Sequence, residues 1–402
     1  MKIVHTADWH WSEHRLDKCR QSAEFILARL EDIRPDLHII AGDYWDKRQV
    51  LARSSAALPA IEAMMRLASI SPVIVILGND AHDAAGSLEL FGDLRTVYPV
   101  YASERPETIA LRLGKDAQPY FERCAPFSDL EKKSGVPQVL VHLLPYFTKS
   151  HLLAERSEMS IDASNLYLRE SLRKIFLGFA AVGAGHACPH ILAGHCSITG
   201  ALISSGQTLI GQDVEVSKND LALACADYYA LGHIHVNQEI APGMWYAGST
   251  YHNNFGETER KYFNIVDFAH KRLAVERIEI PSRPLSLHEV RLDSATDTLV
   301  DEKGVEDWSG AELRVRVHLK KEQERSVDDG RIRRKFPGAW SYSIERIIAP
   351  EERLRSEGIA DARSLKEKLR EWAFTVERDV PNEVLEIADE AEAAVRSTIQ
   401  EG

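Results

Sequence analysis

The sequence lacks the features that mark membrane, secreted and zinc-ribbon proteins. Its apolar runs have the length of strands and are far too short to cross a bilayer, and the opening MKIVHTADWH contains no apolar segment of the secretory type. Its five cysteines are scattered without a Cys-x-x-Cys pair, and this odd number fits neither a disulfide framework nor a zinc ribbon. We therefore expect a cytoplasmic protein with reduced thiols and no membrane partner.

Positive charge is also scarce. The 49 lysines and arginines are outnumbered by 61 aspartates and glutamates, which gives a formal net charge of −12. This balance argues against a surface that is basic all over, but it leaves room for one basic patch or for bound metal ions. With 44% hydrophobic and 27% charged residues, the 402-residue chain has the composition of a globular protein and enough length for two domains.

Through the first 280 residues, apolar runs of strand length alternate with helical patterns. Helical spacing covers residues 17–33, 54–68 and 166–179. The segments expected to form strands are KIVHTAD, LHIIAGD, VIVILGN, QVLVHLLPY, HILAGH, DYYALGHIH, MWYAGS and YFNIVDF. Because this alternation is typical of βαβ units whose strands are buried on both faces, we predict an α/β fold, a two-sheet sandwich flanked by helices.

The texture of the sequence changes after residue 280. The segment PSRPLS has the composition of a linker, and beyond it the charge density rises while histidine becomes rare. We therefore predict one domain over residues 1–280 and a smaller one over residues 281–402.

The C-terminal part contains both strand and helix patterns. AELRVRVHLKK alternates as a half-exposed strand does, and we expect a turn at Asp329-Gly330 before RIRRKF. The residues of a helical stripe farther on are Leu365, Leu369, Trp372 and Val376. The chain from Pro381 is also expected to be helical. These patterns predict a small α+β domain with C-terminal helices.

Side chains with oxygen and imidazole donors follow the ends of several predicted strands. The motifs are Asp8-Trp9-His10, Gly42-Asp43, Gly78-Asn79, Gly194-His195 and Gly232-His233-Ile234-His235. Alone, Gly42-Asp43 could be a simple turn and His195 a core histidine. Because ligands collect at the carboxyl ends of strands in open α/β sheets, however, we expect the whole set to converge. Such donors suit manganese, zinc or iron, and the lack of thiolates argues against structural zinc.

Taken in order, the motifs DWH, GDYWD, GND, GH and GHIH resemble those of the calcineurin-like metallophosphoesterases. The segment YYALGHIH, followed by YAGSTYHNNFGE, is similar to the SbcD family, the bacterial nuclease subunits that act with the SbcC ATPase and correspond to the nuclease of the MRN repair complex. The resemblance implies a metallophosphoesterase sandwich, with the smaller C-terminal domain as a DNA-capping domain. It also implies hydrolysis of phosphodiester bonds at DNA ends or hairpins.

The resemblance further implies two divalent cations, for which manganese is expected and magnesium, zinc or iron(II) are alternatives. The residues implied as ligands are Asp8, His10 and His235 for one cation, Asn79, His195 and His233 for the other, and Asp43 as the bridge between them. Two adjacent cations stabilise both the entering and the leaving oxygen of a displacement at phosphorus. Asp46 is expected to orient the neighbouring loop.

The family pattern has a histidine directly after the asparagine, where this sequence has Asp80. A carboxylate near two cations is a poor proton donor at neutral pH, and its charge repels a phosphate. Three explanations stay open. His82 has taken over the catalytic role, or Asp80 is an engineered substitution, or the chain is a nuclease-poor subunit. Loss of positioned acid–base catalysis typically costs about 10²–10⁴-fold in rate.

DNA contact and partners are less clearly marked. The densest basic region ends with Arg331, Arg333, Arg334 and Lys335, which either contact DNA phosphates or form a solvated face. Trp9, Trp11 and Tyr44 near the metal motifs either stack on unpaired bases or pack in the core.

The resemblance implies a homodimer that acts on double-stranded DNA ends, with an SbcC-type ATPase on the C-terminal helices. The helical stripe could instead pack within its own domain, and the 54–68 helix could form the dimer face or cover a sheet. Two other functions stay open, a phosphoesterase for small phosphate esters and a non-catalytic DNA-end-binding or scaffolding subunit.

Overall fold

The computed structural model describes residues 1–47, 54–124, 136–147, 161–204, 207, 214–269, 273–293, 296–302, 308–349, 359, 361–376 and 378–400. The chain divides into two compact units. Unit 1 comprises Met1–Leu287 with two short later segments, Asp307–Arg314 and Gly338–Ser341, and unit 2 comprises the remaining residues. Each unit is described by itself, and the domain boundary after residue 280 stays a prediction.

Unit 1 is built on two sheets. The strands of the six-stranded sheet are, in spatial order, β15 (Ala274–Ile280), β14 (Lys261–Asp267), β1 (Lys2–Thr6), β2 (Leu37–Ile40), β3 (Val73–Ile76) and β4 (Val100–Ser103). Those of the seven-stranded sheet are β12 (Gln238–Ala241), β13 (Met244–Tyr246), β11 (Tyr228–Gly232), β8 (His190–His195), β7 (Val139–Leu144), β5 (Glu107–Leu113) and β6 (Pro119–Cys124). β1 to β4 run parallel, as do β7, β8, β11 and β13.

The two sheets pack face to face around an apolar layer. In β1, Ile3 points into this layer, while the next residue, Val4, packs on the opposite face with the helices. The same alternation in β3 places Ile74 and Ile76 between the sheets. Successive strand residues point to opposite faces, so strands buried on both sides need apolar residues throughout. The predicted two-sheet α/β sandwich is therefore confirmed.

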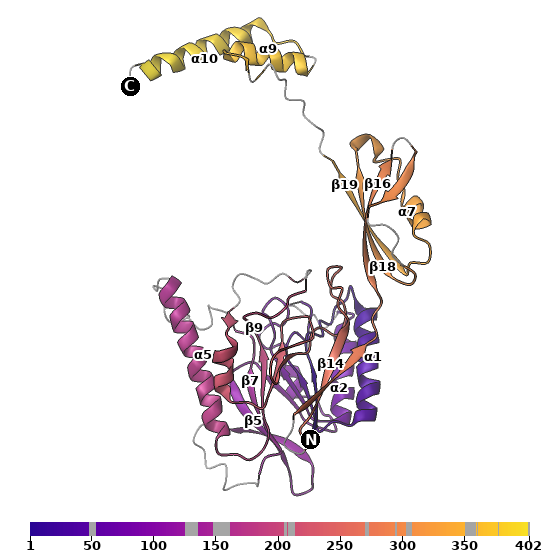
Figure 1. Ribbon diagram of the computed structural model, residues 1–402, viewed down its shortest axis with the longest axis vertical. Coiled ribbons are helices and arrows are strands. Elements are labelled where there is room, and N and C mark those ends of the chain that lie inside the picture. The colour runs from indigo at the N-terminus through magenta and orange to yellow at the C-terminus, as the bar shows by residue number, and fades with distance from the viewer. Residues whose placement is uncertain are drawn as a thin grey trace. The chain divides into compact units, whose positions relative to one another are not determined.

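Helices cover the outer faces of the sheets (Figure 1). α1 (Leu16–Ile33) and α2 (Ala57–Ile70) lie on the six-stranded sheet, and α5 (Ile161–Gly183) lies on the seven-stranded one. These three helices match the three predicted helical segments. The shorter elements of unit 1 are α3 (Glu89–Gly92), β9 (Ser197–Ile198), β10 (Glu215–Val216), α6 (Lys218–Leu221) and the 3₁₀ turn Ala222–Ala224.

Unit 1 differs from the predictions in its aromatic residues and in several additional strands, including β4, β12 and β15. The antiparallel hairpin of β5 and β6 was not predicted, because its charged and Gly-containing sequence lacks a continuous apolar run. Trp9, Trp11 and Tyr44 are at most 3% exposed and belong to the core beneath α1 and α2, so stacking on unpaired bases is wrong for them.

Among its described residues, unit 2 contains most of a four-stranded sheet together with several helices. The sheet order is β17 (Thr298–Asp301), β16 (Leu285–Asp293), β18 (Glu312–Leu319) and β19 (Ser341–Ile348). The helices are α7 (Asp329–Lys335), α9 (Leu365–Thr375) and α10 (Asn382–Gln400), and Lys321–Gln323 forms a 3₁₀ turn. Alternate residues of β18 are buried, as predicted for a half-exposed strand.

The predicted turn at Asp329-Gly330 is wrong, because helix α7 begins there. The carboxylate of Asp328 accepts a hydrogen bond from Arg331 N at 2.6 Å and caps the helix, and Ile332 anchors it in the core. Aspartate before glycine signals a turn, but aspartate is equally a favoured N-cap residue. The basic residues that follow therefore lie on a helix.

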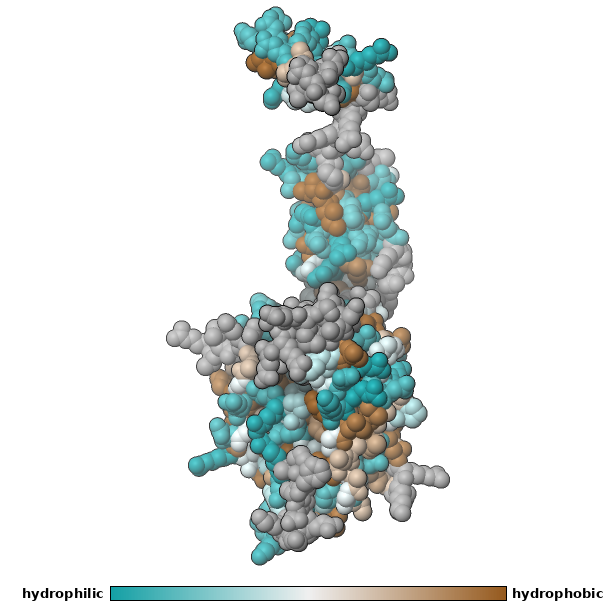
Figure 2. Space-filling view, turned by 90° about the vertical axis from the view of Figure 1, so that its left-hand side faces the viewer, coloured by the Kyte–Doolittle hydropathy of each residue, from teal (hydrophilic) through white to brown (hydrophobic). Residues whose placement is uncertain are grey.

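Helices α9 and α10 pack side by side (Figure 1), and Ala373 of α9 and Leu385 and Ala388 of α10 are buried. Ser364 and Glu367 form a capping box at the start of α9. Figure 2 shows apolar side chains exposed among hydrophilic ones on this pair. Among the described helices, none has the length and apolar character to cross a membrane, and the cytoplasmic location stays a prediction.

Buried histidines predict the pH dependence of stability. His5, His38 and His142 are fully buried, and burial lowers the pKa of each from 6.5 to about 3. Below pH 6.5 the unfolded chain binds protons that the folded chain does not. Stability is therefore retained above about pH 6.5 and falls below it, by about 1.4 kcal/mol per pH unit for each histidine.

We expect urea unfolding between pH 8 and 5 to show this loss. The ring of His142 stacks on that of Phe179, with 4.9 Å between the ring centroids, so a phenylalanine at this position is a suitable control. His142→Phe should reduce the slope below pH 6.5 by one histidine's share, about 1.4 kcal/mol per pH unit. An unchanged slope would contradict this account.

Candidate metal centre

The candidate ligands lie together where the carboxyl ends of strands from both sheets meet. Those from the six-stranded sheet are Asp8 and His10 after β1, Asp43 after β2 and Asn79 after β3, and those from the seven-stranded sheet are His195 at the end of β8 and His233 and His235 after β11. All seven are buried. Backbone hydrogen bonds from Asp8 N to Gly42 O and from His10 N to Asp43 O, each 3.0 Å, hold the first two loops together.

Hydrogen bonds also join the two sheets at this point. His195 Nδ1 donates to the carbonyl oxygen of Ala41 at 2.7 Å. The backbone N–H of His233 donates to the carboxylate of Asp8, with 3.1 Å to Oδ1 and 3.2 Å to Oδ2. The ligand loops of one sheet are thus positioned by those of the other.

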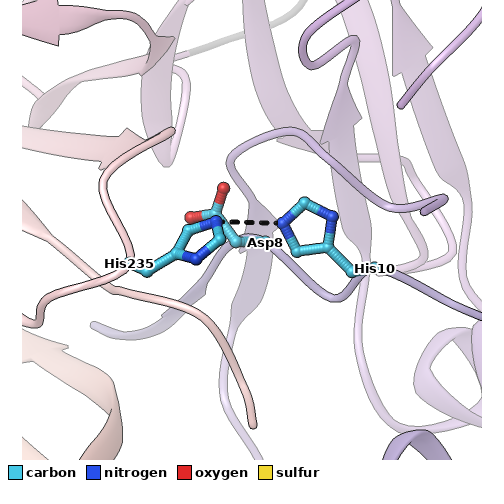
Figure 3. Close-up of side chains that lie close together, drawn as sticks. All are labelled: Asp8, His10 and His235. Carbon is cyan, nitrogen blue, oxygen red and sulfur yellow. Dashed lines mark hydrogen bonds between the residues drawn. The ribbon is translucent and has the colours of Figure 1, made fainter. Parts of the chain in front are cut away.

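Among the described residues, three groups of donors have the spacing of a metal site, and two of them include Asp8. Asp8, His10 and His235 form the first, in which the Nε2 atoms of the two imidazoles face one another at 3.1 Å with the Asp8 carboxylate beside them (Figure 3). Asp8, Asp43 and His195 form the second. Asp43 faces both, because its Oδ1 lies 3.4 Å from His195 Nε2 and its Oδ2 lies 3.8 Å from His10 Nε2.

His233 and Asn79 lie beside the second group. The ring centroid of His233 is 5.2 Å from that of His195. The backbone N–H of Asn79 donates to Asp43 Oδ1 at 2.5 Å, and its side-chain oxygen accepts from Ala81 N at 2.9 Å. The structure therefore gathers all seven candidate ligands, while their roles as ligands stay predictions.

The loops that carry the candidate ligands have unusual backbone conformations. Asp8, His10, Asp43 and His233 have φ values of 51°, 44°, 49° and 95°, in the left-handed region that side chains rarely adopt. Such strain persists where surrounding contacts impose it, and it collects at functional sites.

Glycines allow the loops to approach one another. A Cβ atom on Gly78 would lie 2.1 Å from both the backbone nitrogen and Oδ1 of Asp43, and one on Gly42 would lie 2.1 Å from His195 Nδ1. No side chain fits in either place.

The electrostatics of the centre are dominated by Asp43. Burial alone would raise its pKa, but the charge of His195 holds the pKa of Asp43 well below its usual range. In turn, although burial favours neutral imidazole, the charge of Asp43 raises the pKa of His195 to about 9. The buried carboxylate thus attracts positive charge, which a proton or a cation can supply.

The donor set fits divalent cations. His195 and His235 each donate from Nδ1, to Ala41 O and Glu257 Oε1 respectively, which leaves the Nε2 lone pairs directed at the centre. Within the described residues, His195 Nε2 is buried without a hydrogen-bond partner. Imidazole nitrogens combined with carboxylate oxygens suit manganese, iron or zinc.

His82 lies at the centre, whereas Asp80 does not join its donor groups. The ring centroid of His82 is 4.5 Å from that of His10, and its Nδ1 donates to Asp46 O at 2.8 Å. His10, Asp46 and His82 form a third group with metal-site spacing. Asp80 is half-buried and belongs to none of the donor groups found among the described residues. Asp46 also pairs with Arg15 at 2.7 Å.

Two carboxylates of the centre were not predicted as site residues. Asp83 accepts hydrogen bonds from the backbone nitrogens of Gly78, Trp45 and Tyr44 at 2.8, 2.9 and 3.3 Å, so it joins the loops after β2 and β3. Burial and then the charge of Asp43 raise the pKa of Asp83 to about 7. In the sequence, the only sign of a role for Asp83 was its position directly after His82.

Glu257 is the second. It accepts from His235 Nδ1 at 2.8 Å and pairs with the buried Lys261 at 2.6 Å. Burial alone would raise its pKa, but His235 and Lys261 lower the pKa of Glu257 to about 2. Glu257 is the last residue of the motif YAGSTYHNNFGE, which indicated a family but gave no role for this glutamate.

The proposed DNA-contact residues lie on α7 of unit 2. Arg333 and Arg334 are exposed, and the Arg333 guanidinium lies 5.0 Å from the ring centroid of Tyr342. Lys335 Nζ is 5.8 Å from the ring of Phe336. Arg331, by contrast, pairs with the Asp297 carboxylate at 3.1 Å.

Comparison with known proteins identifies the relatives of this chain. Residues 1–237 match the family described as calcineurin-like phosphoesterase. The SbcD component of the SbcCD nuclease of Staphylococcus epidermidis is 25% identical over 303 residues, which cover 72% of each chain. The component of the same name from Escherichia coli K12 is 22% identical over 322 residues, which cover 74% of this chain and 73% of its own. A solved dimetal phosphatase from Danio rerio aligns with 70% of this chain and 97% of its own, at 12% identity and a TM-score of 0.41.

Gly78 provides a test of the close approach at the centre. We expect Gly78→Ala to displace Asp43, to destabilise the fold by about 1–3 kcal/mol through overpacking, and to abolish binding of Mn²⁺. Thermal unfolding and calorimetric titration with Mn²⁺ would measure the two effects. Gly178→Ala is the matched control, because Gly178 lies in α5 with open space at its Cβ position, and it should bind Mn²⁺ normally. Normal Mn²⁺ binding by Gly78→Ala would be evidence against the centre.

Proposed function

Because the chain belongs to the calcineurin-like phosphoesterase family, we propose that it is a metal-dependent nuclease subunit that hydrolyses phosphodiester bonds at DNA ends or hairpins. The observation that carries the proposal is the position of Asp43, which faces His195 Nε2 at 3.4 Å and His10 Nε2 at 3.8 Å. One carboxylate between two sets of donors suits a pair of adjacent cations. DNA as the substrate is supported by the relatives named as nuclease components.

Two divalent cations, with manganese as the expected pair, would polarise the phosphodiester and lower the pKa of a water molecule. The residues proposed to hold them are Asp8, His10 and His235 on one side, Asn79, His195 and His233 on the other, and Asp43 between them. The hydrogen bonds at Nδ1 fix the rings of His195 and His235, so that Nε2 is the atom that would hold a cation in both.

We assign the proton-donor role to His82 rather than Asp80. The bond from Nδ1 to Asp46 O fixes the ring of His82 beside His10 and leaves Nε2 as the atom that can reach the substrate. Burial alone would lower the pKa of His82, but the charge of Asp43 and the Asp46 carbonyl raise it, which favours the imidazolium. Its Nε2 proton would pass to the leaving oxygen.

DNA contact is assigned chiefly to Arg333 and Arg334, the exposed basic residues of α7. Lys335 and Arg331 would contribute less, since Arg331 is already paired with Asp297. Replacement of Arg333 and Arg334 by alanine should reduce the salt dependence of DNA binding, with a slope lower by about 1 for each lost phosphate contact.

Partner surfaces are proposed from exposed apolar residues. Phe374 and Ile387, on the α9–α10 pair, are 85% and 63% exposed, and we propose that an SbcC-type ATPase docks there. Phe374→Asp should abolish copurification with the ATPase.

Leu58 of α2 is 73% exposed and is proposed to lie in a homodimer interface. Leu58→Asp should convert dimers to monomers in size-exclusion chromatography.

The function is tested by cleavage of linear double-stranded DNA in Mn²⁺. We expect the chain to cut DNA faster than a chromogenic phosphate monoester, and Asp43→Asn, which removes the shared carboxylate, to lose activity by at least about 10³-fold. A faster reaction with the monoester would favour a small-ester phosphoesterase. Binding of DNA ends and of Mn²⁺ without any cleavage would favour a scaffolding role.

His82 has a prediction of its own. We expect His82→Ala to lower kcat by about 10²–10⁴-fold while calorimetry shows Mn²⁺ binding intact. Asp80→Ala is the matched control in the same loop and should change kcat little. If instead His82→Ala is fully active, or if only Asp80→His confers activity, the relocated proton donor is ruled out.

A further inference from the structure

A buried pair of opposite charges lies directly behind one of the candidate ligands. Glu257 and Lys261 are 0% and 1% exposed, and Lys261 Nζ lies 2.6 Å from Glu257 Oε2. Taking two charges out of water is costly, and an apolar pair of similar size is often at least as stabilising. Stability alone is therefore a weak reason for this pair, and its contacts point to a more specific role.

The contacts of the Glu257 carboxylate hold it against His235. Oε1 accepts from His235 Nδ1 at 2.8 Å and from Asn254 Nδ2 at 3.1 Å. Oε2 accepts from Lys261 Nζ and, at 3.1 Å, from the backbone nitrogen of Asn253. A carboxylate without a proton can only accept, so His235 must carry its hydrogen on Nδ1. Its Nε2 lone pair is then directed at His10 Nε2, 3.1 Å away (Figure 3).

Lys261 holds both ends of this arrangement. Besides Glu257, its ammonium group donates to Ser249 Oγ at 2.9 Å and approaches the carbonyl oxygen of His235 at 3.4 Å. Ser249 N in turn donates to the same carbonyl at 3.2 Å. Lys261 therefore contacts the carboxylate that holds the ring of His235 and the backbone that carries it.

His195, on the other side of the centre, is supported differently. It donates from Nδ1 to a neutral backbone carbonyl, that of Ala41. A carboxylate behind an imidazole increases its basicity and fixes its orientation more strongly than a carbonyl does, and loss of such a partner typically weakens metal binding by about 10–100-fold. The two sides of the centre are therefore supported unequally.

We propose that Glu257, held by Lys261, is a positioning residue that fixes the tautomer and orientation of His235 and so strengthens binding of the cation at Asp8, His10 and His235. The inference rests on the metal centre of the proposed function and adds a residue pair outside its ligand set. In the described contacts Glu257 reaches no candidate ligand other than His235, through which it would act.

Calorimetric titration of the full chain with Mn²⁺ tests the inference without an activity assay. Glu257→Gln keeps an oxygen that can accept from His235 Nδ1 but loses the charge, and we expect one of two Mn²⁺ affinities to fall about 10–100-fold while the other changes little. Electron paramagnetic resonance of bound Mn²⁺ should show the corresponding loss of occupancy.

Glu259→Gln is the matched control, because Glu259 pairs with the same lysine at 2.9 Å. In the described contacts it reaches no candidate ligand, so its two Mn²⁺ affinities should match those of the unaltered chain. A second variant, Glu257→Gln with Lys261→Met, removes both charges and keeps the test possible if a lone buried lysine prevents folding. It should lose the same affinity as Glu257→Gln.

The outcomes separate this inference from the function on which it rests. If the unaltered chain binds two Mn²⁺ ions and Glu257→Gln binds both equally well, the positioning role is wrong and the nuclease proposal stands. An equal loss in Glu259→Gln would also overturn it, because the effect would then belong to the lysine network in general. If the unaltered chain binds no Mn²⁺, the centre and the inference fail together.

Discussion

The carboxylate of Asp43 is buried at the place where the ends of two sheets meet, and the candidate metal centre is organised around its charge. A buried charge is tolerated only with hydrogen bonds and opposite charge around it. The backbone N–H of Asn79 supplies one of these contacts, and imidazoles from both sheets supply others. The other candidate ligands, the glycines that make room for them and the strained loops are arranged around this single group.

Strain and close approach are two consequences of that arrangement. Loops from five strands converge on a small volume, so their backbones must bend sharply and touch. Left-handed conformations at Asp8, His10 and Asp43 achieve the bend, and the bare Cα of Gly78 allows contact with Asp43. These conformations persist because surrounding contacts hold them in place, among them the backbone hydrogen bonds from Asp8 N to Gly42 O and from His10 N to Asp43 O.

The loop after β3 illustrates how a departure from a sequence pattern is accommodated. The carbonyl oxygen of Asn79 accepts hydrogen bonds from the backbone nitrogens of both His82 and Asp83 at 2.8 Å, so the chain turns back on itself. The turn leaves Asp80 half-exposed and returns His82 and Asp83 to the centre. His82 thereby lies beside His10, and Asp83 reaches three backbone N–H groups.

Local patterns in the chain were enough to predict the sandwich and the three long helices of unit 1, because the periodicities of strands and helices are local. They were also enough to predict the order in which candidate ligands follow strand ends, because the ligand residues adjoin those strands. The start of α7 was mistaken, since the same Asp-Gly pair serves a turn and a capped helix. The folded chain was needed to see that Asp83 joins two loops and that Glu257 supports His235. Those hydrogen bonds join residues 38 and 22 positions apart, and a contact between distant residues leaves no periodic pattern in the chain.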